Sequence, residues 1–340
     1  MLPPLPDVLA RAHVIRLGMN VKFRGVTERE IVLFEGPQGW AEFAPFVEYD
    51  DDESASWLRG ALEWGWGCDV PPVRTHVPVN ATMPAVPAGR VESVLERFGD
   101  MGERPTVKVK VAERGQALVD DLARVRQVRD LLPTANIRVD ANGGWSESEA
   151  VDALSALADL GLEYAEQPVP SVEALARVRE TLDARGVPLL IAADESVRKA
   201  EDPLRVARLG AADLLVVKAM PLGGVARALS IVKESGLPCV VSSALDSSVG
   251  IAAGVALAAA LPELPYACGL ATVALFAEDV ADPSLVPQGG MIRVEDAKRV
   301  HSGDAVRQDL IERASVEGQR KQWWLDRVAR TYANLVNAEA

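Results

Sequence analysis

Histidine and cysteine are scarce in this chain of 340 residues. It has three histidines, His13, His76 and His301, and none has a neighbour that completes a metal-ligand pattern, so a histidine-based zinc site is not expected. The three cysteines are far apart in the sequence. Their odd number and low density favour the reducing cytoplasm over a disulfide-linked secreted fold.

Long apolar runs and a basic charge balance are also missing. The first twenty residues lack a basic region followed by an apolar stretch, so no signal peptide is expected. The most apolar window, from Val249, is too short to cross a bilayer and predicts a buried helix. The net charge of -13 argues against nucleic acid or an anionic membrane as a partner. The sequence does not indicate whether the protein is a monomer or a homo-oligomer.

From about residue 73, short β-branched runs alternate with longer segments of helical periodicity. The predicted strands lie within residues 73–81, 106–111, 135–142, 162–168, 188–196, 212–220, 237–247 and 266–276. Each but the last is followed by a predicted helix, which indicates parallel strands with right-handed crossovers. A closed barrel fits this count. An open doubly wound sheet is the alternative, although no GxGxxG motif follows an early strand.

Residues 1–72 have a different pattern. Three strand-like runs and a helix from about Glu53 to Trp66 predict an α+β capping domain. Residues 291–340 contain a short strand-like run and a predicted helix over 319–337, and we expect them to complete the cap. Residues 73–290 are then the barrel, with the active site at the C-terminal ends of its strands.

Ionisable residues end four consecutive predicted strands. Asp140, Glu166, Asp194 and Lys218 follow one another at spacings of 26, 28 and 24 residues, one strand-helix unit each. In a parallel barrel these ends meet at one face, where three crowded carboxylates require a proton or a cation. Oxygen ligands without histidine or cysteine favour Mg²⁺ or Mn²⁺. Any one of these residues alone is more often a solvated loop residue or a helix cap.

Two lysines share a face of the strand before Asp140. Lys108 and Lys110 are two residues apart among β-branched residues, so both ammonium groups point the same way. We expect that direction to be the barrel mouth, across from Lys218; the alternative is a solvent-facing strand edge. A lysine close to a divalent cation and another ammonium has a lowered pKa and can act as a general base.

These residues give the sequence its resemblance to the enolase superfamily, in the branch similar to muconate-lactonizing enzymes. The matching motifs are KVK at 108–110, VDAN with Asp140, EQP with Glu166, ADES with Asp194 and VVK with Lys218. The resemblance covers nearly the whole chain. It implies an enolase-type modified (β/α)8 barrel, a (β/α)7β barrel with an α+β capping domain. It also implies Mg²⁺ held by the three carboxylates, with Lys110 as base on one face and Lys218 on the other. The barrel strands carry no histidine base of the mandelate racemase kind.

Three stretches, residues 22–36, 242–254 and 264–276, resemble the dehydratases of menaquinone biosynthesis within this branch. That resemblance implies a syn dehydration of a succinyl-substituted hydroxycyclohexadiene carboxylate through an enediolate, a small-molecule carboxylate substrate. Lys110 would take the proton and assist the leaving hydroxide, Lys108 would contact the substrate carboxylate, and Lys218 would stabilise the anion. A lid over residues 19–25 would exclude water.

A further set of residues is predicted to contact the substrate. The candidate substrate-binding residues are Ser242, Ser243, Ser247, Arg24 and Asn142. The serines would bind the succinyl carboxylate at a loop-helix junction, or else are ordinary turn and cap residues. Glu195, beside Asp194, would support the metal ligands.

Two other functions fit the same residues. An N-acylamino-acid racemase or dipeptide epimerase would use two opposed lysines for 1,1-proton transfer. A non-catalytic barrel that binds a carboxylate is the remaining alternative, although binding alone would not require a base on each face.

Overall fold

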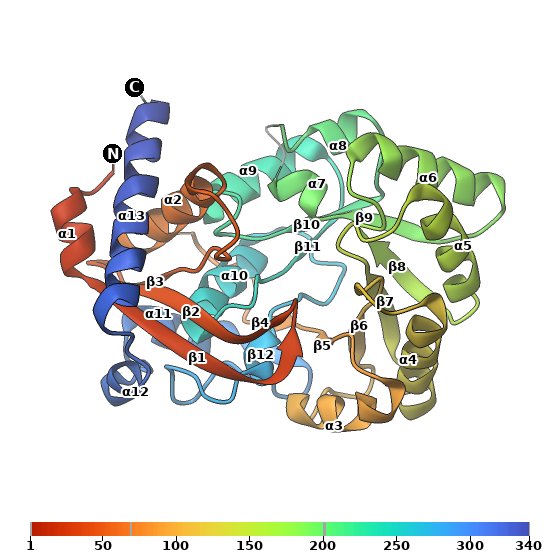
Figure 1. Cartoon of the computed structure of the whole chain (residues 1–340), viewed down its shortest axis with the longest axis horizontal. Coiled ribbons are helices and arrows are strands. Elements are labelled where there is room, and N and C mark those ends of the chain that lie inside the picture. Colours follow the sequence, from red (N-terminus) through yellow and green to blue (C-terminus); the bar gives the residue numbers. More distant parts are fainter. Residues whose placement is uncertain (1, 69, 200–201, 340) are drawn as a thin grey trace.

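The larger part of the molecule is a curled parallel sheet surrounded by helices (Figure 1). The structure is a computed structural model that describes residues 2–68, 70–199 and 202–339. Its seven strands lie in the order of the chain, each parallel to the next. They are β5 (Ala81–Met83), β6 (Thr106–Lys110), β7 (Asn136–Asp140), β8 (Leu162–Glu166), β9 (Leu190–Ala193), β10 (Leu214–Val217) and β11 (Cys239–Val241). The predicted α/β barrel is confirmed, and the open doubly wound alternative is wrong.

Two residues close the barrel in place of a full eighth strand. Cys268 forms a parallel bridge with Val79, and Gly269 forms one with Ser242. The segment therefore joins the residues before β5 to the end of β11, which gives the (β/α)7β arrangement. The rest of the predicted strand is irregular and contains the 3₁₀ helix η3 (Thr272–Leu275).

Helices follow each of the seven strands. They are η1 (Ala88–Arg90), α3 (Val91–Leu95) and η2 (Glu96–Phe98), then α4 (Leu118–Leu131), α5 (Glu147–Ala158), α6 (Val172–Ala184), α7 (Glu195–Arg198), α8 (Arg205–Arg208), α9 (Val225–Ser235) and α10 (Ser248–Ala260). Helix α5 begins with a capping box, in which Ser146 and Glu149 satisfy each other's backbone N–H groups. Helix α10 is the buried helix predicted from the apolar window.

The first predicted barrel strand, over residues 73–81, is wrong in its bounds. Residues 76–78 form β4 (His76–Pro78), which pairs antiparallel with β12 (Met291–Arg293) outside the barrel. The barrel strand β5 begins at Ala81. Alternation of apolar residues runs through both segments, and the sequence pattern does not show where the chain changes partner.

The cap is built on an antiparallel sheet of β1 (Ala12–Phe23), β2 (Val26–Glu35) and β3 (Trp40–Phe43), with α1 (Leu5–Ala10) and α2 (Asp51–Gly67) beside it. The C-terminal segment adds α11 (Val294–Ser302), α12 (Gln308–Arg313) and α13 (Gly318–Glu339). Helix α13 packs against α1, α2 and β1 on the side of the molecule away from the barrel helices (Figure 1). This packing supports the predicted domain boundaries at residues 72 and 291, which stay a prediction.

The cap is joined to the barrel mouth by buried polar residues. Arg29 on β2 donates hydrogen bonds to the carbonyls of Ala44 and Leu245, and so links the cap to the loop after β11. Glu42 on β3 accepts hydrogen bonds from the Ser247 and Gly250 N–H groups at the N-terminus of α10. Burial and the charge of Asp246 outweigh these donors and raise the pKa of Glu42 well above its usual range, so the contact fixes the cap on the barrel through hydrogen bonds rather than through charge.

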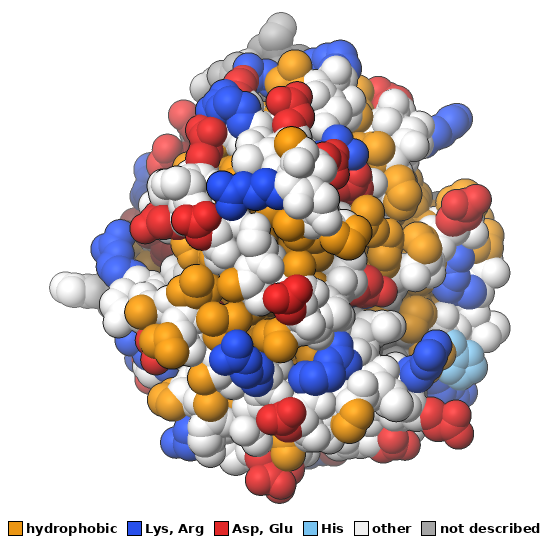
Figure 2. Space-filling model, turned by 90° about the vertical axis from the view of Figure 1, so that its right-hand side faces the viewer, with side chains coloured by type: hydrophobic (Ala, Val, Ile, Leu, Met, Phe, Trp, Pro, Cys, Tyr) orange, Lys and Arg blue, Asp and Glu red, His pale blue; other side chains and the backbone are white. Residues whose placement is uncertain are grey.

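Apolar and charged side chains are buried together inside the barrel. Tyr164, Ala192, Leu214, Val216 and Val240 form a separate buried apolar cluster. The buried guanidinium of Arg138 lies 4.7 Å from the centre of the Tyr164 ring and donates a hydrogen bond to Asn80 Oδ1. On the outer face that Figure 2 shows, acidic and basic side chains are interspersed with apolar ones. Within the described ranges, no helix is long and apolar enough to span a membrane.

Candidate active site

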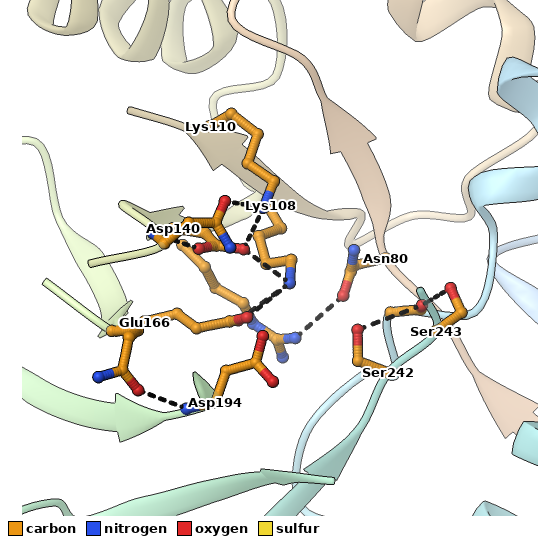
Figure 3. A network of polar contacts seen from close by, with 12 residues as sticks. Asn80, Lys108, Lys110, Asp140, Glu166, Asp194, Ser242 and Ser243 are labelled. Atoms are coloured by element: carbon orange, nitrogen blue, oxygen red, sulfur yellow. Dashed lines mark hydrogen bonds and ion pairs between the residues drawn. The ribbon is translucent and has the colours of Figure 1, made fainter. Parts of the chain in front are cut away.

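The predicted ionisable residues meet at the C-terminal ends of the barrel strands. In the parallel register, Lys110 on β6 lies beside Asp140 on β7, and Asp140 lies beside Glu166 on β8. Asp194 directly follows β9 and Lys218 directly follows β10. All five side chains are buried. Figure 3 shows Asp140, Glu166 and Asp194 directed into the same space, with Ser242 and Ser243 across from them.

Lys108 connects two of the carboxylates. Its Nζ lies 3.0 and 2.9 Å from the two carboxylate oxygens of Glu166 and 3.2 Å from Asp140 Oδ2 (Figure 3). Burial alone would lower the pKa of Lys108, but the charges of Glu166 and Asp140 outweigh it and raise the pKa above its usual range. Lys108 is therefore a fixed cation in this arrangement and is poorly suited to accept a proton.

Lys110 has a different electrostatic environment. Its Nζ donates hydrogen bonds to Asp140 Oδ2 at 2.5 Å and to Asn142 Oδ1 at 2.6 Å. The pKa of Lys110 is lowered because burial outweighs the attraction of Asp140, and the neighbouring charge of Lys108 adds to the effect. A lowered pKa makes the neutral amine more accessible, as a general base requires. Of the two lysines on β6, Lys110 is the better base.

Lys218 faces the ring of carboxylates from the opposite side of the barrel. Its Nζ donates a hydrogen bond to Asp194 Oδ2, and the other oxygen, Asp194 Oδ1, lies 3.2 Å from Arg198 Nε. Burial opposes ionisation of Asp194, but these two cations outweigh it and bring its pKa to about 2. The mouth thus has lysines from β6 on one side and from the end of β10 on the other.

The carboxylates do not share the positive charge equally. Burial would raise the pKa of Asp140, but Lys110 and Lys108 hold it below its usual range. Glu166 is the opposite case: burial and the charge of Asp140 raise its pKa to about 7, despite its contacts with Lys108. The site therefore contains one carboxylate whose negative charge the protein itself compensates poorly.

The donor set fits a hard divalent cation. Three buried carboxylates supply the oxygen ligands that Mg²⁺ and Mn²⁺ prefer. A second observation agrees: Glu195 Oε2, next to Asp194, is buried without a hydrogen-bond partner among the described residues. In the arrangement seen here, the lysines hold the carboxylates, and no group of three acidic, histidine or cysteine side chains within the described ranges converges as a ready-made metal cluster. Lys108 contacts Glu166 and Asp140, Lys110 contacts Asp140, and Lys218 contacts Asp194.

Two adjoining cavities lie at the mouth. The inner one, of about 30 Å³, is lined by Asp140 and the three lysines, with Ser242 and Ser243 on the opposite wall. The outer one, of about 460 Å³, lies between the tip of the β1–β2 hairpin and the loop after β6. Phe23, Arg24, Lys110 and Asn142 line both cavities and thus separate them.

The predicted substrate-contact residues divide into two groups. Ser242, Ser243, Arg24 and Asn142 line the inner cavity. The structure does not bring Ser247 there: its Oγ donates a hydrogen bond to Glu42 Oε2 at 2.5 Å, and it is the N-cap of α10. The helix N-terminus expected to receive the substrate carboxylate already holds a carboxylate of the cap.

Several buried polar residues at the site were not singled out from the sequence. Gln167, in the EQP motif, accepts hydrogen bonds from the backbone N–H groups of Asp194 and Ser196 and so fixes the turn that carries Asp194. Arg198, four residues after Asp194, contacts both Asp194 and Glu195. The spacing of Arg198 from Asp194, one helical turn, was the available signal.

Comparison with known proteins identifies relatives of the whole chain. Residues 91–298 match the model of the enolase C-terminal domain-like family, and residues 14–65 match the enolase N-terminal domain-like family. The chain is 54% identical to the o-succinylbenzoate synthase of Mycolicibacterium smegmatis, over 98% of both chains. It is 52% identical to the enzyme of the same name from Mycobacterium tuberculosis, over 99% of this chain and 98% of that one.

A solved structure shares the fold at low sequence identity. The 2-chloromuconate cycloisomerase of Rhodococcus opacus superposes with a TM-score of 0.73 at 23% identity and covers 90% of this chain and 98% of its own. This likeness supports the barrel-and-cap architecture.

Proposed function

The chain belongs to the enolase superfamily, and from this membership and the geometry of its barrel mouth we propose that it catalyses the o-succinylbenzoate synthase reaction. The reaction removes water from 2-succinyl-6-hydroxy-2,4-cyclohexadiene-1-carboxylate and yields 2-succinylbenzoate, a step of menaquinone biosynthesis. The observation that carries the proposal is the similarity of 50–54% identity, over nearly the full chain, to enzymes of that name. The two opposed lysines supply the chemistry that the reaction requires.

The proton-transfer steps follow from the positions of the lysines. Lys110, with its lowered pKa, removes the proton from the carbon that carries the substrate carboxylate. The electron pair moves into the carboxylate and forms an enediolate. The C6–oxygen bond then breaks, Lys110 returns its proton to the departing hydroxyl group on the same face, and water leaves as the ring becomes aromatic. Lys218, on the other face, stabilises the anion by its positive charge.

The three carboxylates would hold the cofactor. Enolase-superfamily sites use a lysine or histidine base together with one or two Mg²⁺ ions. We propose Asp140, Glu166 and Asp194 as ligands of Mg²⁺, with Mn²⁺ as a substitute. The chemistry that such an ion supplies is neutralisation of negative charge on the substrate carboxylate. Lys108, released from Glu166, is then placed to donate a hydrogen bond to that carboxylate.

The substrate must extend beyond the inner cavity. An engineered protein cavity of about 150 Å³ binds one benzene ring, whereas the inner cavity has only about 30 Å³. The outer cavity adjoins it at Lys110 and Arg24, so the ring and its succinyl arm fit when the tip of the β1–β2 hairpin moves. Arg24, Ser242 and Ser243 are the proposed contacts of the succinyl carboxylate.

Turnover of the synthetic cyclohexadiene substrate, followed by ultraviolet absorbance, tests the proposal. We expect dehydration that stops with a chelator and returns on addition of Mg²⁺. A parallel measurement follows deuterium exchange at the α-carbon of an N-succinylamino acid in D₂O, the reaction of the racemase alternative. Exchange without dehydration would assign the site to racemisation, and the absence of both reactions would favour a non-catalytic barrel.

A further inference from the structure

Arg198 links the cap to the carboxylate ring. It lies on α7, its side chain is 3% exposed, and its guanidinium has a separate partner for each nitrogen. Nε lies 3.2 Å from Asp194 Oδ1, one terminal nitrogen donates to Glu195 Oε1 at 2.8 Å, and the other donates to the Tyr49 hydroxyl at 3.3 Å. Tyr49 belongs to the loop before α2, so a single side chain contacts the cap and a proposed metal ligand.

The same contacts continue to the proposed base. Glu195 Oε1, which Arg198 holds, also accepts a hydrogen bond from Asn142 Nδ2 at 3.2 Å. Asn142 Oδ1 in turn accepts the hydrogen bond from Lys110 Nζ at 2.6 Å, and the Asn142 N–H donates to Asp140 Oδ1 at 3.0 Å. A continuous series of hydrogen bonds therefore runs from Arg198 through Glu195 and Asn142 to Lys110.

From this arrangement we infer that Arg198 is a positioning residue for both the metal ligand Asp194 and the base Lys110. Its Nε fixes Asp194 Oδ1, which leaves Asp194 Oδ2 directed at Lys218. Its terminal nitrogen fixes Glu195, which orients the Asn142 amide on Lys110. The inference rests on the proposed function in two respects, the assignment of Asp194 as a metal ligand and of Lys110 as the base.

The geometry requires an arginine rather than a point charge. A guanidinium presents five N–H donors in a planar fork and can hold Asp194, Glu195 and Tyr49 at once, whereas a lysine ammonium on a flexible stem cannot match this geometry. Glu195 depends on this fork because its second oxygen has no partner among the described residues. Loss of Arg198 would leave the buried Asp194 with Lys218 as its ion-pair partner and would remove the ion pair of the partly buried Glu195.

Because Arg198 contacts Tyr49, the orientation of the Arg198 side chain depends on the position of the cap. The Tyr49 ring packs edge-to-face against Phe46 and Trp57, with centroids 5.5 and 6.2 Å apart. Lys199 Nζ lies 4.2 Å from the centre of the same ring. The hydroxyl that meets Arg198 is thus held by cap residues. Glu53 Oε1, also in the cap, lies 3.9 Å from the same terminal nitrogen, so a displaced cap would remove both of these contacts from the guanidinium.

Mn²⁺ affinity and steady-state kinetics of three variants test the inference. In Arg198→Met we expect Mn²⁺ to bind about 10- to 100-fold more weakly, the usual cost of losing a group that orients a metal ligand, and kcat to fall. Arg198→Lys should recover part of the Mn²⁺ affinity, since it returns a charge beside Asp194, but little of kcat. Tyr49→Phe should leave Mn²⁺ affinity unchanged and lower kcat a few-fold. Isothermal titration calorimetry gives the affinity independently of turnover.

Arg179→Met is the matched control. Arg179 also pairs with a carboxylate through two nitrogens, to Asp213 at 3.0 and 2.7 Å, but it lies on the outer helix α6. It should leave both Mn²⁺ affinity and kcat unchanged. Circular dichroism checks the fold of each variant; if Arg198→Met does not fold, Arg198→Lys carries the comparison.

A double-mutant cycle separates positioning from a structural role. If Arg198 acts on Lys110 through Asn142, then Asn142→Ala should cost less kcat in the Arg198→Lys background than in the wild type. Additive effects on kcat, or wild-type Mn²⁺ affinity in a folded Arg198→Met, would overturn the inference. A wild-type enzyme that binds no Mn²⁺ would overturn both this inference and the metal assignment. Mn²⁺ binding sensitive to Arg198 without dehydration would overturn the proposed function and support the inference.

Discussion

Two paired glutamates, the partly buried Glu30 in the cap and the buried Glu166 in the barrel mouth, have pKa shifts of opposite direction. Glu30 accepts hydrogen bonds from Arg16, Arg320 and Trp324, which attach helix α13 to the cap sheet. Burial would raise its pKa, but these donors outweigh burial and bring the pKa to about 2. The cations of Arg16 and Arg320 therefore compensate the negative charge of Glu30.

Glu166 and Asp140 share one cation, the ammonium group of Lys108. Lys108 contacts both Glu166 and Asp140, and the carboxylate of Asp140 is itself a source of repulsion. Burial and the charge of Asp140 therefore outweigh Lys108 and raise the pKa of Glu166 to about 7. Burial of a charged group alone does not separate a structural residue from a functional one. The informative difference is whether the surrounding protein supplies enough opposite charge, because a deficit leaves room for a bound cation.

The largest expected effect is that of removing the base from the mouth. Lys110→Ala should lower kcat about 10³- to 10⁴-fold, since general base catalysis contributes up to this much. Mg²⁺ affinity should change little, because Lys110 is not a metal ligand. Lys233→Ala, on the exposed side of α9, is the control and should keep full activity. Near-normal turnover by the Lys110 variant in the ultraviolet assay would contradict the mechanism.

Removing the undercompensated charge should affect cation binding more than folding. Glu166→Gln should weaken Mg²⁺ binding by more than about 100-fold, because a ligand is lost rather than an outer partner. The thermal midpoint of the metal-free protein should fall little, whereas added Mg²⁺ should stabilise the wild type alone. Differential scanning calorimetry with and without Mg²⁺ measures both. A variant still stabilised by Mg²⁺ would show that Glu166 is not a ligand.

The smallest expected effect is in the cap. Glu30→Gln should lower the free energy of unfolding by about 1–2 kcal/mol near neutral pH, the usual worth of charge-assisted hydrogen bonds. The pKa of Glu30 is about 2 in the folded state and near 4.5 otherwise, so the folded state binds fewer protons between these values. Stability should therefore rise with pH from about 2 to 4.5 in the wild type, and less steeply in the variant.

Denaturant titrations at a series of pH values measure this difference. Glu147→Gln is a suitable control, since Glu147 pairs with Arg177 on the exposed surface and should contribute little. If the free energy of unfolding depends on pH equally in the wild type and in Glu30→Gln, the lowered pKa of Glu30 does not contribute to stability.

The barrel and its carboxylate ring were predictable because both repeat along the chain. Each unit begins with a strand that ends in an ionisable residue, so Asp140, Glu166 and Asp194 recur at nearly constant spacing and lie at the same face once the sheet closes. The pairing of β4 with β12 was not predictable in this way. Its strands are three residues each and lie more than two hundred positions apart, and nothing local in either identifies the other.

Individual side-chain contacts between distant segments could not be predicted from the sequence pattern either. Ser247 stands before an apolar helix, and its sequence surroundings are those of any N-cap or anion-binding serine. Whether it meets substrate or protein depends on Glu42, which a separate element brings to the same place. Arg198 resembles a surface arginine of a short helix until the cap covers it.

The two-residue closure of the barrel places two walls at the rim. One wall carries the carboxylates and lysines, and the other is formed by the closing segment and the end of β11. Gly269 lies so close to β11 that an added Cβ would come within 2.4 Å of Ser242 Oγ, so the closing segment sets the shape of that wall through backbone alone. The wall it forms with Ser242 and Ser243 lies opposite the carboxylate ring and carries no ligand of it. Directed evolution toward new substrates should therefore begin at this seam, where pocket shape can be altered while the proton-transfer machinery is left in place.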